Sequence, residues 1–239
     1  MSCTNFLLEA VGTSSMRFVV TIDGPAGSGK STIARRLAGQ LGWRLLDTGA
    51  MYRAVTVAAL RAEIDLEDEK ALGELAARTT VRLLDDRVLL DGEDVTTLIR
   101  SVDVTRATKY IAGSPRVRTQ LVEWQRLASE DNHLVTEGRD QGTVVFPEAF
   151  CKFYLTASLE ERARRRHEEF TTKGQIGSIE IVRKDLSDRD DGDASRTIAP
   201  MKPADDAILI DTTDMDLDQV LTRIESEVRA RLQCHNSPS

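Results

Sequence analysis

The sequence predicts an α/β fold in which a parallel β-sheet is covered by helices on both faces. Three observations lead to this prediction. First, an apolar, β-branched run at residues 18–22 leads into a glycine-rich stretch and then into an amphipathic helix that ends at Gly42. Second, further apolar runs of strand length alternate with helical patterns, as in a parallel sheet. Third, the segment 81–90 breaks this alternation with a hairpin pattern, which predicts an inserted subdomain.

The remaining elements can be placed from their apolar patterns and capping residues. Ser114 followed by Pro115 gives one helix an N-cap and a first-turn proline. Ser158 and Glu161 have capping-box spacing and open an arginine-rich helix, and a last amphipathic helix covers residues 217–232. We expect the sheet strands at residues 18–22, 44–46, 133–136, 151–155 and 207–211.

These elements predict a single domain with two added parts. Apolar runs at 81–84 and 88–90 flank a short charged turn, so an inserted subdomain with a small antiparallel sheet is expected at about 65–115. The segment at about 161–196 is dense in charge and interrupted by glycines, and it predicts a second mobile, helical part. The other expected parts are a core of residues 16–64, 116–160 and 197–232, a flexible extension of residues 1–15, and a disordered tail of residues 233–239. Met16 stands directly before the first strand and is a second candidate start.

Composition restricts the class of protein. The chain has 239 residues, 41% of them hydrophobic, which suits one sizeable domain. Its formal net charge of −7 disfavours binding to nucleic-acid polymers or to anionic membranes, and no apolar run approaches the ~20 residues of a membrane span. The three cysteines form no CxxC pair and the three histidines have no metal-ligand spacing. We therefore expect a cytoplasmic protein without a disulfide framework or a zinc site.

The glycine-rich stretch matches the phosphate-binding motif G-x-x-x-x-G-K-[ST], the P-loop. Backbone N–H groups of such a loop surround the phosphates of a nucleoside triphosphate, and the following helix adds the positive end of its dipole. Lys30 is expected between the β and γ phosphates, and Ser31 is the expected ligand of Mg²⁺. The predicted ATP and magnesium site comprises Gly24, Pro25, Ala26, Gly27, Ser28, Gly29, Lys30, Ser31 and Thr32.

Three further segments place polar residues near expected strand ends, where ligands of open α/β sheets bind. Thr48 and Arg53 offer a hydroxyl and a guanidinium to a second phosphate group, or are merely a helix cap and a solvated arginine. Glu137 could order the water shell of Mg²⁺ and Arg139 could contact a phosphate. The run 189–196 could close arginines over a transferring phosphoryl group. Four more arginines precede this run; most are expected to face solvent and one or two to reach phosphate (Arg162, Arg164, Arg165 and Arg166).

Taken together, these segments resemble those of the bacterial cytidylate kinases. The resemblance extends from residue 18 to about 232 and is most specific in the stretch E-G-R-D-Q-G-T-V-V-F-P at 137–147. It implies transfer of the γ-phosphoryl group of ATP to CMP or dCMP with Mg²⁺. It also implies a core, a nucleoside-monophosphate-binding insert and a lid in a monomeric cytosolic enzyme. The segments that carry it are 24–31, 48–53, 115–118, 137–147, 189–191 and 199–200.

The resemblance also implies roles for individual residues. Thr48 and Arg53 would bind the CMP phosphate, Arg118 and Asp140 the cytosine, Arg189 and Asp193 the ribose, and Arg139 and Arg196 the phosphates. The catalytic set would be Lys30, Arg139, Arg189 and Arg196. Three positions depart from the family pattern. Lys109 stands where a base-contacting serine is common, with Thr108 beside it as the alternative source of a hydroxyl. Glu137 replaces an aspartate and Gly192 replaces a basic residue.

The expected chemistry needs no general base. A phosphomonoester has a second pKa of about 6, so most CMP is dianionic at neutral pH. The barrier is then repulsion between anions and the spread charge of a loose, in-line transition state, which cations and positioning address. A regulatory GTPase is the rival outside metabolism, but the sequence has no Asn-Lys-x-Asp guanine signature. A P-loop kinase for UMP, AMP or shikimate is the nearer rival.

Overall fold

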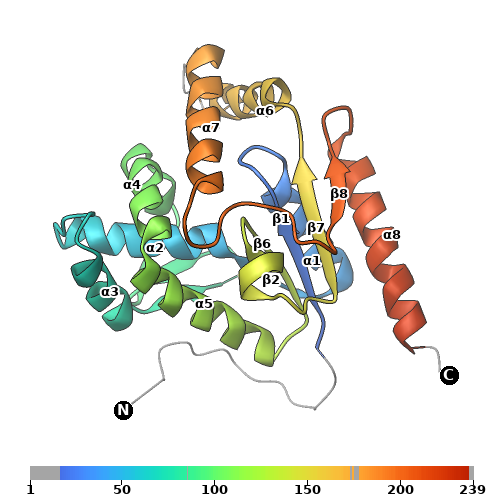
Figure 1. Ribbon diagram of the computed structural model, residues 1–239, viewed down its shortest axis with the longest axis horizontal. Coiled ribbons are helices and arrows are strands. Elements are labelled where there is room, and N and C mark those ends of the chain that lie inside the picture. The colour runs from blue at the N-terminus through green and yellow to red at the C-terminus, as the bar shows by residue number, and fades with distance from the viewer. Residues whose placement is uncertain (1–16, 85, 173, 175–177, 237–239) are drawn as a thin grey trace. The chain divides into compact units, whose positions relative to one another are not determined.

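The computed structural model describes residues 17–84, 86–172, 174 and 178–236 (Figure 1). The chain divides into two compact units. Unit 1 holds residues 17–18 with Leu45–Leu134, and unit 2 holds Val19–Arg44 with the described part of Val135–Ser239. The expected extension of residues 1–15 lies outside the described residues.

The main sheet confirms the predicted α/β class. It has five strands in the order β2-β6-β1-β7-β8, and the β1–β7 and β7–β8 pairs are parallel. In the β1–β7 register Asp23 lies opposite Tyr154, so the last residue of β1 is held beside the end of its neighbour. The strands are β1 (Val19–Asp23), β2 (Arg44–Asp47), β6 (Leu134–Gly138), β7 (Cys151–Thr156) and β8 (Ile208–Asp211).

Unit 2 is built around β1 and β7. Val20, Ile22, Phe153 and Leu155 are fully buried there because both faces of these strands are covered, as their β-branched and apolar sequence requires. The helices of this unit are α1 (Lys30–Leu41), α6 (Leu159–Thr172), α7 (Ile179–Ala194) and α8 (Leu217–Asn236), with one π-helical turn, η2 (Gln141–Val145). Helices α1 and α8 pack together, as do α6 and α7 (Figure 1).

Unit 1 combines helices with a small antiparallel sheet of order β3-β4-β5. The predicted hairpin is confirmed, with Leu83 opposite Val88. Helix α3 approaches α5 closely at Gly73, where a Cβ atom would lie 2.7 Å from the Cβ of Arg116. The elements are α2 (Thr48–Arg61), α3 (Glu69–Arg78), β3 (Val81–Leu83), β4 (Val88–Leu90), β5 (Glu93–Asp94), the 3₁₀ turn η1 (Leu98–Arg100), α4 (Val102–Gly113) and α5 (Pro115–Glu130).

Two boundaries differ from the sequence prediction. Unit 1 is wider than the insert expected at about 65–115, because α2 packs against α4 and α5 packs against α3, which brings both flanking helices into the same core. Helix α8 continues to Asn236, into the stretch 233–239 where a disordered tail was expected. Within the described ranges, none of the helices has the length and apolar character needed to cross a membrane.

Candidate functional site

The P-loop connects β1 to α1 within unit 2. Its first residue, Gly24, has φ 139°, and a Cβ atom there would lie 2.0 Å from the carbonyl oxygen of Leu155, so only glycine fits. Gly29 is the N-cap of α1 in a left-handed conformation and makes no side-chain cap. The first N–H groups of α1 therefore face the loop without a side-chain acceptor from the cap, which is the arrangement that binds phosphate.

Lys30 lies folded against this loop. Its Nζ donates to the carbonyl oxygen of Pro25 at 2.5 Å and to Ser28 Oγ at 3.3 Å, and the residue is only 5% exposed. Burial, followed by the positive charge of Arg139, lowers the pKa of Lys30 to about 7, although Glu137 opposes the shift. A phosphate anion beside Lys30 would stabilise the charged form of its ammonium group, which is consistent with the expected role of Lys30.

Ser31 and Glu137 provide oxygen ligands suited to Mg²⁺. The Ser31 hydroxyl donates to Glu137 Oε1 at 2.9 Å, and Glu137 is buried at the end of β6. Because the hydroxyl proton points to the carboxylate, the lone pairs of Ser31 Oγ remain for a cation. Hydroxyl, carboxylate and phosphate oxygens are the ligands Mg²⁺ prefers. The longer side chain at Glu137, in place of the usual aspartate, therefore still meets the P-loop.

Asp193 on α7 holds two of the predicted phosphate-binding arginines. Its carboxylate accepts from Arg139 Nε at 2.8 Å and from Arg196 Nη2, and all three side chains are largely buried. Burial opposes ionisation of Asp193, yet Arg139, Arg196 and Arg189 together hold its pKa below the ordinary value. Unit 2 thus joins the residue that follows β6, the last turn of α7 and Arg196, two residues beyond α7, through charged groups.

Asp23, which the sequence did not single out, fixes the neighbouring segment. Its two carboxylate oxygens accept from the backbone N–H groups of Gln141 at 2.9 Å and Gly142 at 2.7 Å. Burial raises the pKa of Asp23 to about 7 even though these two donors favour the ionised form. The Asp23 carboxylate therefore connects the end of β1 to the π-helical turn η2. Asp140, the residue before this turn, is buried. A charged residue ending an apolar strand was the signal that could have identified it.

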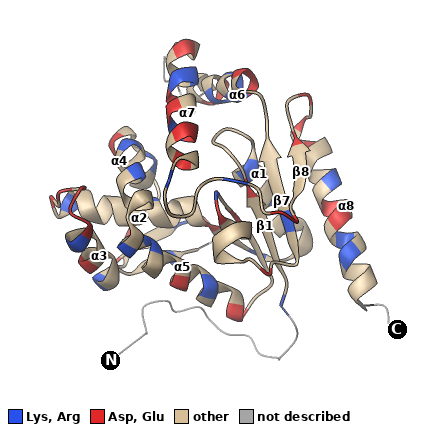
Figure 2. Cartoon of the chain, in the orientation of Figure 1, with Lys and Arg blue, Asp and Glu red and all other residues tan. Residues whose placement is uncertain are grey.

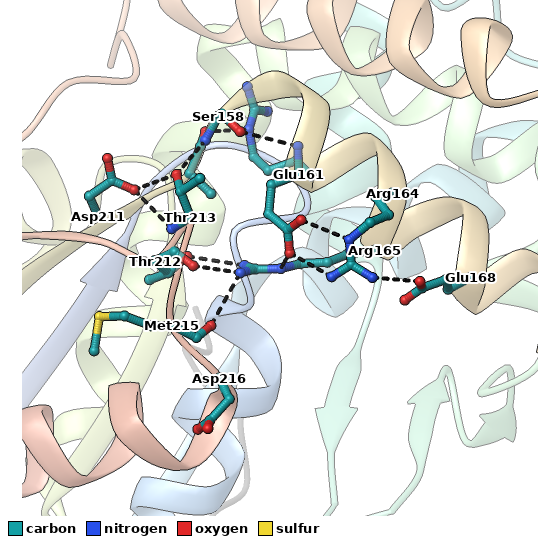
Figure 3. Close-up of polar contacts among 12 residues, drawn as sticks. Ser158, Glu161, Arg164, Arg165, Glu168, Asp211, Thr212, Thr213, Met215 and Asp216 are labelled. Atoms are coloured by element: carbon teal, nitrogen blue, oxygen red, sulfur yellow. Dashed lines mark hydrogen bonds and ion pairs between the residues drawn. The ribbon is translucent and has the colours of Figure 1, made fainter.

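The four arginines of α6 have different environments. Arg164 and Arg165 both bind Glu161, and Arg165 also donates to Thr212 (Figure 3). Arg166 pairs with Glu169 and lies over the ring of Phe170. Arg162 alone among the four donates to the backbone of the P-loop, at Ala26. Arg164 is exposed, Arg165 and Arg166 are half-buried and Arg162 is buried, so the expectation that most of the four face solvent is wrong. That one or two of them reach phosphate stays a prediction.

The predicted phosphate-binding residues of unit 1 lie at the start of α2. Thr48 is buried in the first turn and Arg53 is half-buried farther along the helix. The cap of α2 is Asp47, whose side chain accepts from the N–H of Ala50 at 2.9 Å. The alternative interpretation of Thr48 as a helix cap is therefore wrong, because the preceding aspartate already fills that position.

The predicted base-reading residues of unit 1 have unequal positions. Arg118 is buried on α5, with its guanidinium 5.7 Å from the ring centroid of Tyr52 on α2. Thr108 Oγ1 donates to the carbonyl of Val104 at 2.6 Å and lies 3.3 Å from Thr56 Oγ1 on α2. Lys109 is exposed, and its Nζ lies 4.9 Å from the ring centroid of the adjacent Tyr110.

Comparison with known proteins identifies the family of this chain. Residues 20–230 match the family model described as cytidylate kinase. The chain is 45% identical to the cytidylate kinase of Shewanella sp. strain MR-7, over 91% of this chain and 97% of that one. It is 47% identical to the cytidylate kinase of Pseudomonas syringae pv. tomato, over 89% and 96% respectively. An uncharacterised protein of Eubacterium ventriosum has a similar fold, with a TM-score of 0.50 and 11% identity over 90% of this chain and 99% of that chain.

Proposed function

The chain belongs to the cytidylate kinase family, and from this premise we propose that it transfers the γ-phosphoryl group of ATP directly to CMP or dCMP. The products are ADP and CDP or dCDP, formed in line without a covalent enzyme intermediate. The observation that carries the proposal is the assembly of unit 2. There Ser31 of the P-loop binds Glu137, and Arg139 binds Asp193 of α7, so the loop, the segment 137–140 and α7 are joined by hydrogen bonds and an ion pair.

Unit 2 supplies the donor site. The P-loop, residues 24–32, surrounds the triphosphate, and Lys30 leaves the carbonyl of Pro25 for the β and γ phosphates. Ser31 and Glu137 would hold Mg²⁺ and its water shell. The metal, when bound with ATP, neutralises charge on the phosphate oxygens. Arg139, Arg189 and Arg196 stabilise the charge that spreads over the transferring group, so these arginines and Lys30 are the catalytic residues.

The residues proposed for the acceptor carry groups suited to the parts of CMP. Thr48 and Arg53 bind the CMP phosphate, because a hydroxyl and a planar guanidinium fork suit phosphate oxygens. Arg118 and Asp140 bind the cytosine, and Arg189 and Asp193 bind the ribose. The family commonly has a base-contacting serine at the position of Lys109, and we propose that Thr108 rather than Lys109 takes this role. The Thr108 hydroxyl lies beside Thr56 on α2, the helix that begins at Thr48, whereas the Lys109 ammonium lies over Tyr110.

The reaction follows from these charges. The acceptor oxygen of CMP is already anionic, so no residue has to remove a proton from it. What the protein supplies is a set of fixed cations against two anions that repel each other. Exclusion of water from the closed site would limit wasteful hydrolysis of ATP.

A coupled assay of ADP release with different acceptors tests the proposal. We expect CMP and dCMP to be the best acceptors in a panel with UMP, AMP, GMP and shikimate. Lys30→Ala should lose most turnover while keeping its circular dichroism spectrum. A higher kcat/KM for any other acceptor would contradict the substrate assignment, and near-normal turnover of Lys30→Ala would contradict the role of the loop.

We further propose that the enzyme is a cytoplasmic monomer. The free thiols of Cys151 and Cys234 suit a reducing compartment, in which disulfides are rare. Light scattering coupled to size-exclusion chromatography tests the oligomeric state. A mass near 26.5 kDa is expected, and a mass near twice that value would contradict the monomer.

A further inference from the structure

Both backbone groups of Ala26 in the P-loop are held by side chains of the α6–α7 pair. Its carbonyl oxygen accepts from Arg162 Nη1 of α6 at 3.1 Å. Its N–H donates to Asp190 Oδ1 of α7 at 3.4 Å. Arg162 and Asp190 also form an ion pair with each other. The three groups therefore close a ring of polar contacts, which we call the Ala26 clamp.

Arg162 is fixed in this position from its other side as well. Its Nε donates to the carbonyl of Ala157 at 3.0 Å, at the connection between β7 and α6, and its side chain is 8% exposed. A buried guanidinium with three protein acceptors has little rotational freedom. By contrast, Arg164 of the same helix is 52% exposed and binds only acids of α6 in the described contacts (Figure 3).

Apolar packing supports the same junction. The methyl group of Ala26 lies in a cluster with Ala163 of α6 and with Val182 and Leu186 of α7. The next loop residue, Gly27, has φ 79° and lies close to α6, since a Cβ atom there would lie 3.2 Å from the Cβ of Arg162. The P-loop is thus part of the core of the α6–α7 pair.

The clamp acts on the face of α7 that carries charged groups of the proposed site. Asp190 and Asp193 are three residues apart, so they lie on one face of the helix. Asp190 binds the P-loop, while Asp193 binds Arg139 and Arg196. Helix α7 carries both acidic and basic residues (Figure 2). In the described contacts, Asp190 joins it to the P-loop and Asp193 joins it to Arg139, the residue after β6.

We propose that Arg162 and Asp190 are positioning residues, and that the Ala26 clamp sets the shape of the P-loop and the orientation of α7 together. The inference rests on the proposed function, because it assigns the clamp to phosphoryl transfer. Arg162 and Asp190 act through Ala26 and α7, so a loss of the clamp misplaces both the donor phosphates and the arginines that stabilise their transfer. Small displacements of this kind reduce rates by up to about 100-fold.

Variants of the clamp test the proposal by kinetics. Arg162→Met keeps the apolar stem and removes all donors, and we expect kcat/KM for ATP to fall about 10- to 100-fold. Arg162→Lys, with one cationic centre, should recover part of that loss. Adding Asp190→Asn to Arg162→Met should lower kcat/KM for ATP by less than about threefold more. The effects of residues that act together, as in the clamp, are not additive. Matched controls are Arg164→Met on α6 and Asp188→Asn on α7, where Asp188 pairs with the exposed Lys184; each should stay within about twofold of wild type.

Hydrogen exchange separates failure of the clamp from failure of the proposed function. The exchange rate of the peptide that contains Ala26 is measured without any phosphate acceptor such as CMP. The affinity of the donor site for a fluorescent ATP analogue is measured without an acceptor as well. Arg162→Met should speed exchange of this peptide and weaken the analogue about tenfold, whatever the acceptor proves to be. If Arg162→Met does not fold, Arg162→Lys and Asp190→Asn carry the same tests. Unchanged exchange and analogue affinity in a folded variant, or full additivity of the two substitutions, would overturn the clamp.

Discussion

Single residues of unit 2 are held in charge states that differ from those in water. Lys30 and Asp23 are both buried, and burial moves the pKa of each to about 7, downward for the ammonium and upward for the carboxyl. Neither shift could be predicted from the P-loop motif, because the motif gives the residue types but not their burial. These values make the binding of ATP dependent on pH.

Lys30 is expected to take up a proton when ATP binds. Above pH 7 the free lysine is mostly neutral, and the phosphates raise its pKa by adding negative charge. Affinity for ATP should therefore fall as pH rises above 7, by at most tenfold per unit for one linked proton. Calorimetry of a non-hydrolysable ATP analogue at pH 8, in buffers of different ionisation enthalpy, measures the uptake. Lys30→Met should abolish most of it and Asp23→Asn should keep it; uptake that survives in Lys30→Met would assign the proton to another group.

Asp193 is expected to matter more for CMP than for dCMP. The proposed contact with the ribose is partly lost for a sugar without a 2′-hydroxyl, so Asp193→Ala should reduce kcat/KM more for CMP. Because Asp193 also holds Arg139 and Arg196, dCMP should lose activity as well, chiefly in kcat. Steady-state kinetics with both acceptors, beside Asp188→Asn as a surface control, measures the two effects. Equal losses for CMP and dCMP would contradict the contact of Asp193 with the ribose. Asp193 would then act only by holding Arg139 and Arg196.

At the scale of the element, most strands and helices could be predicted because their signals are local. All five sheet strands lie within one or two residues of the expected bounds. The third strand of the small sheet, Glu93–Asp94, could not be predicted, since both residues are exposed and have no apolar pattern. The cap of α2 was also ambiguous, because Asp47 and Thr48 are both good capping residues and adjoin each other.

The P-loop should be intolerant of a methyl group at its first glycine. Gly24→Ala places a Cβ atom 2.0 Å from the carbonyl oxygen of Leu155 at φ 139°, so the loop must move away from β7. We expect the free energy of unfolding to fall by about 2 to 4 kcal/mol and ATP binding to be lost. Gly39→Ala is the control: it lies in α1 with nothing within 4 Å, and alanine there should stabilise the helix by about 0.5–1 kcal/mol. Urea denaturation of both variants decides the matter, and equal midpoints would contradict the steric argument.

At the scale of the whole molecule, the sequence could not specify which distant side chains meet. Arg162 and Arg164 are both arginines of one charged helix, yet one lies against the P-loop and the other is exposed. Each residue turns a helix by about 100°, and the pattern of α6 has too few apolar residues to fix its buried face. The family resemblance supplied the phosphate-binding residues, but the role of Asp23 and the contacts of Arg162 and Asp190 with the P-loop emerged only from the folded chain.

The proposed enzyme binds ATP and CMP at separate sites that share Arg189, so each ligand alone should stabilise the protein. ATP with Mg²⁺ at 100 times its Kd adds about 2.7 kcal/mol to the free energy of unfolding. For a chain of this size that corresponds to an increase in Tm of about 5–10 °C. Thermal denaturation with each ligand alone and with both ligands measures the shifts, and with both ligands the increase should exceed either one. Competition between ATP and CMP, seen as no further increase, would contradict separate sites.

The ion pairs around Asp193 have a consequence for selectivity against simple anions. Arg139 and Arg196 are already engaged by this carboxylate, so the site does not present two bare positive charges. Inorganic phosphate or sulfate would have to displace Asp193 and offers it no sugar hydroxyl in exchange. A nucleotide with a sugar can exchange partners instead, giving phosphate oxygens to the arginines and a hydroxyl to the carboxylate. The resting protein is therefore expected to discriminate against free phosphate and sulfate while remaining ready for a nucleotide.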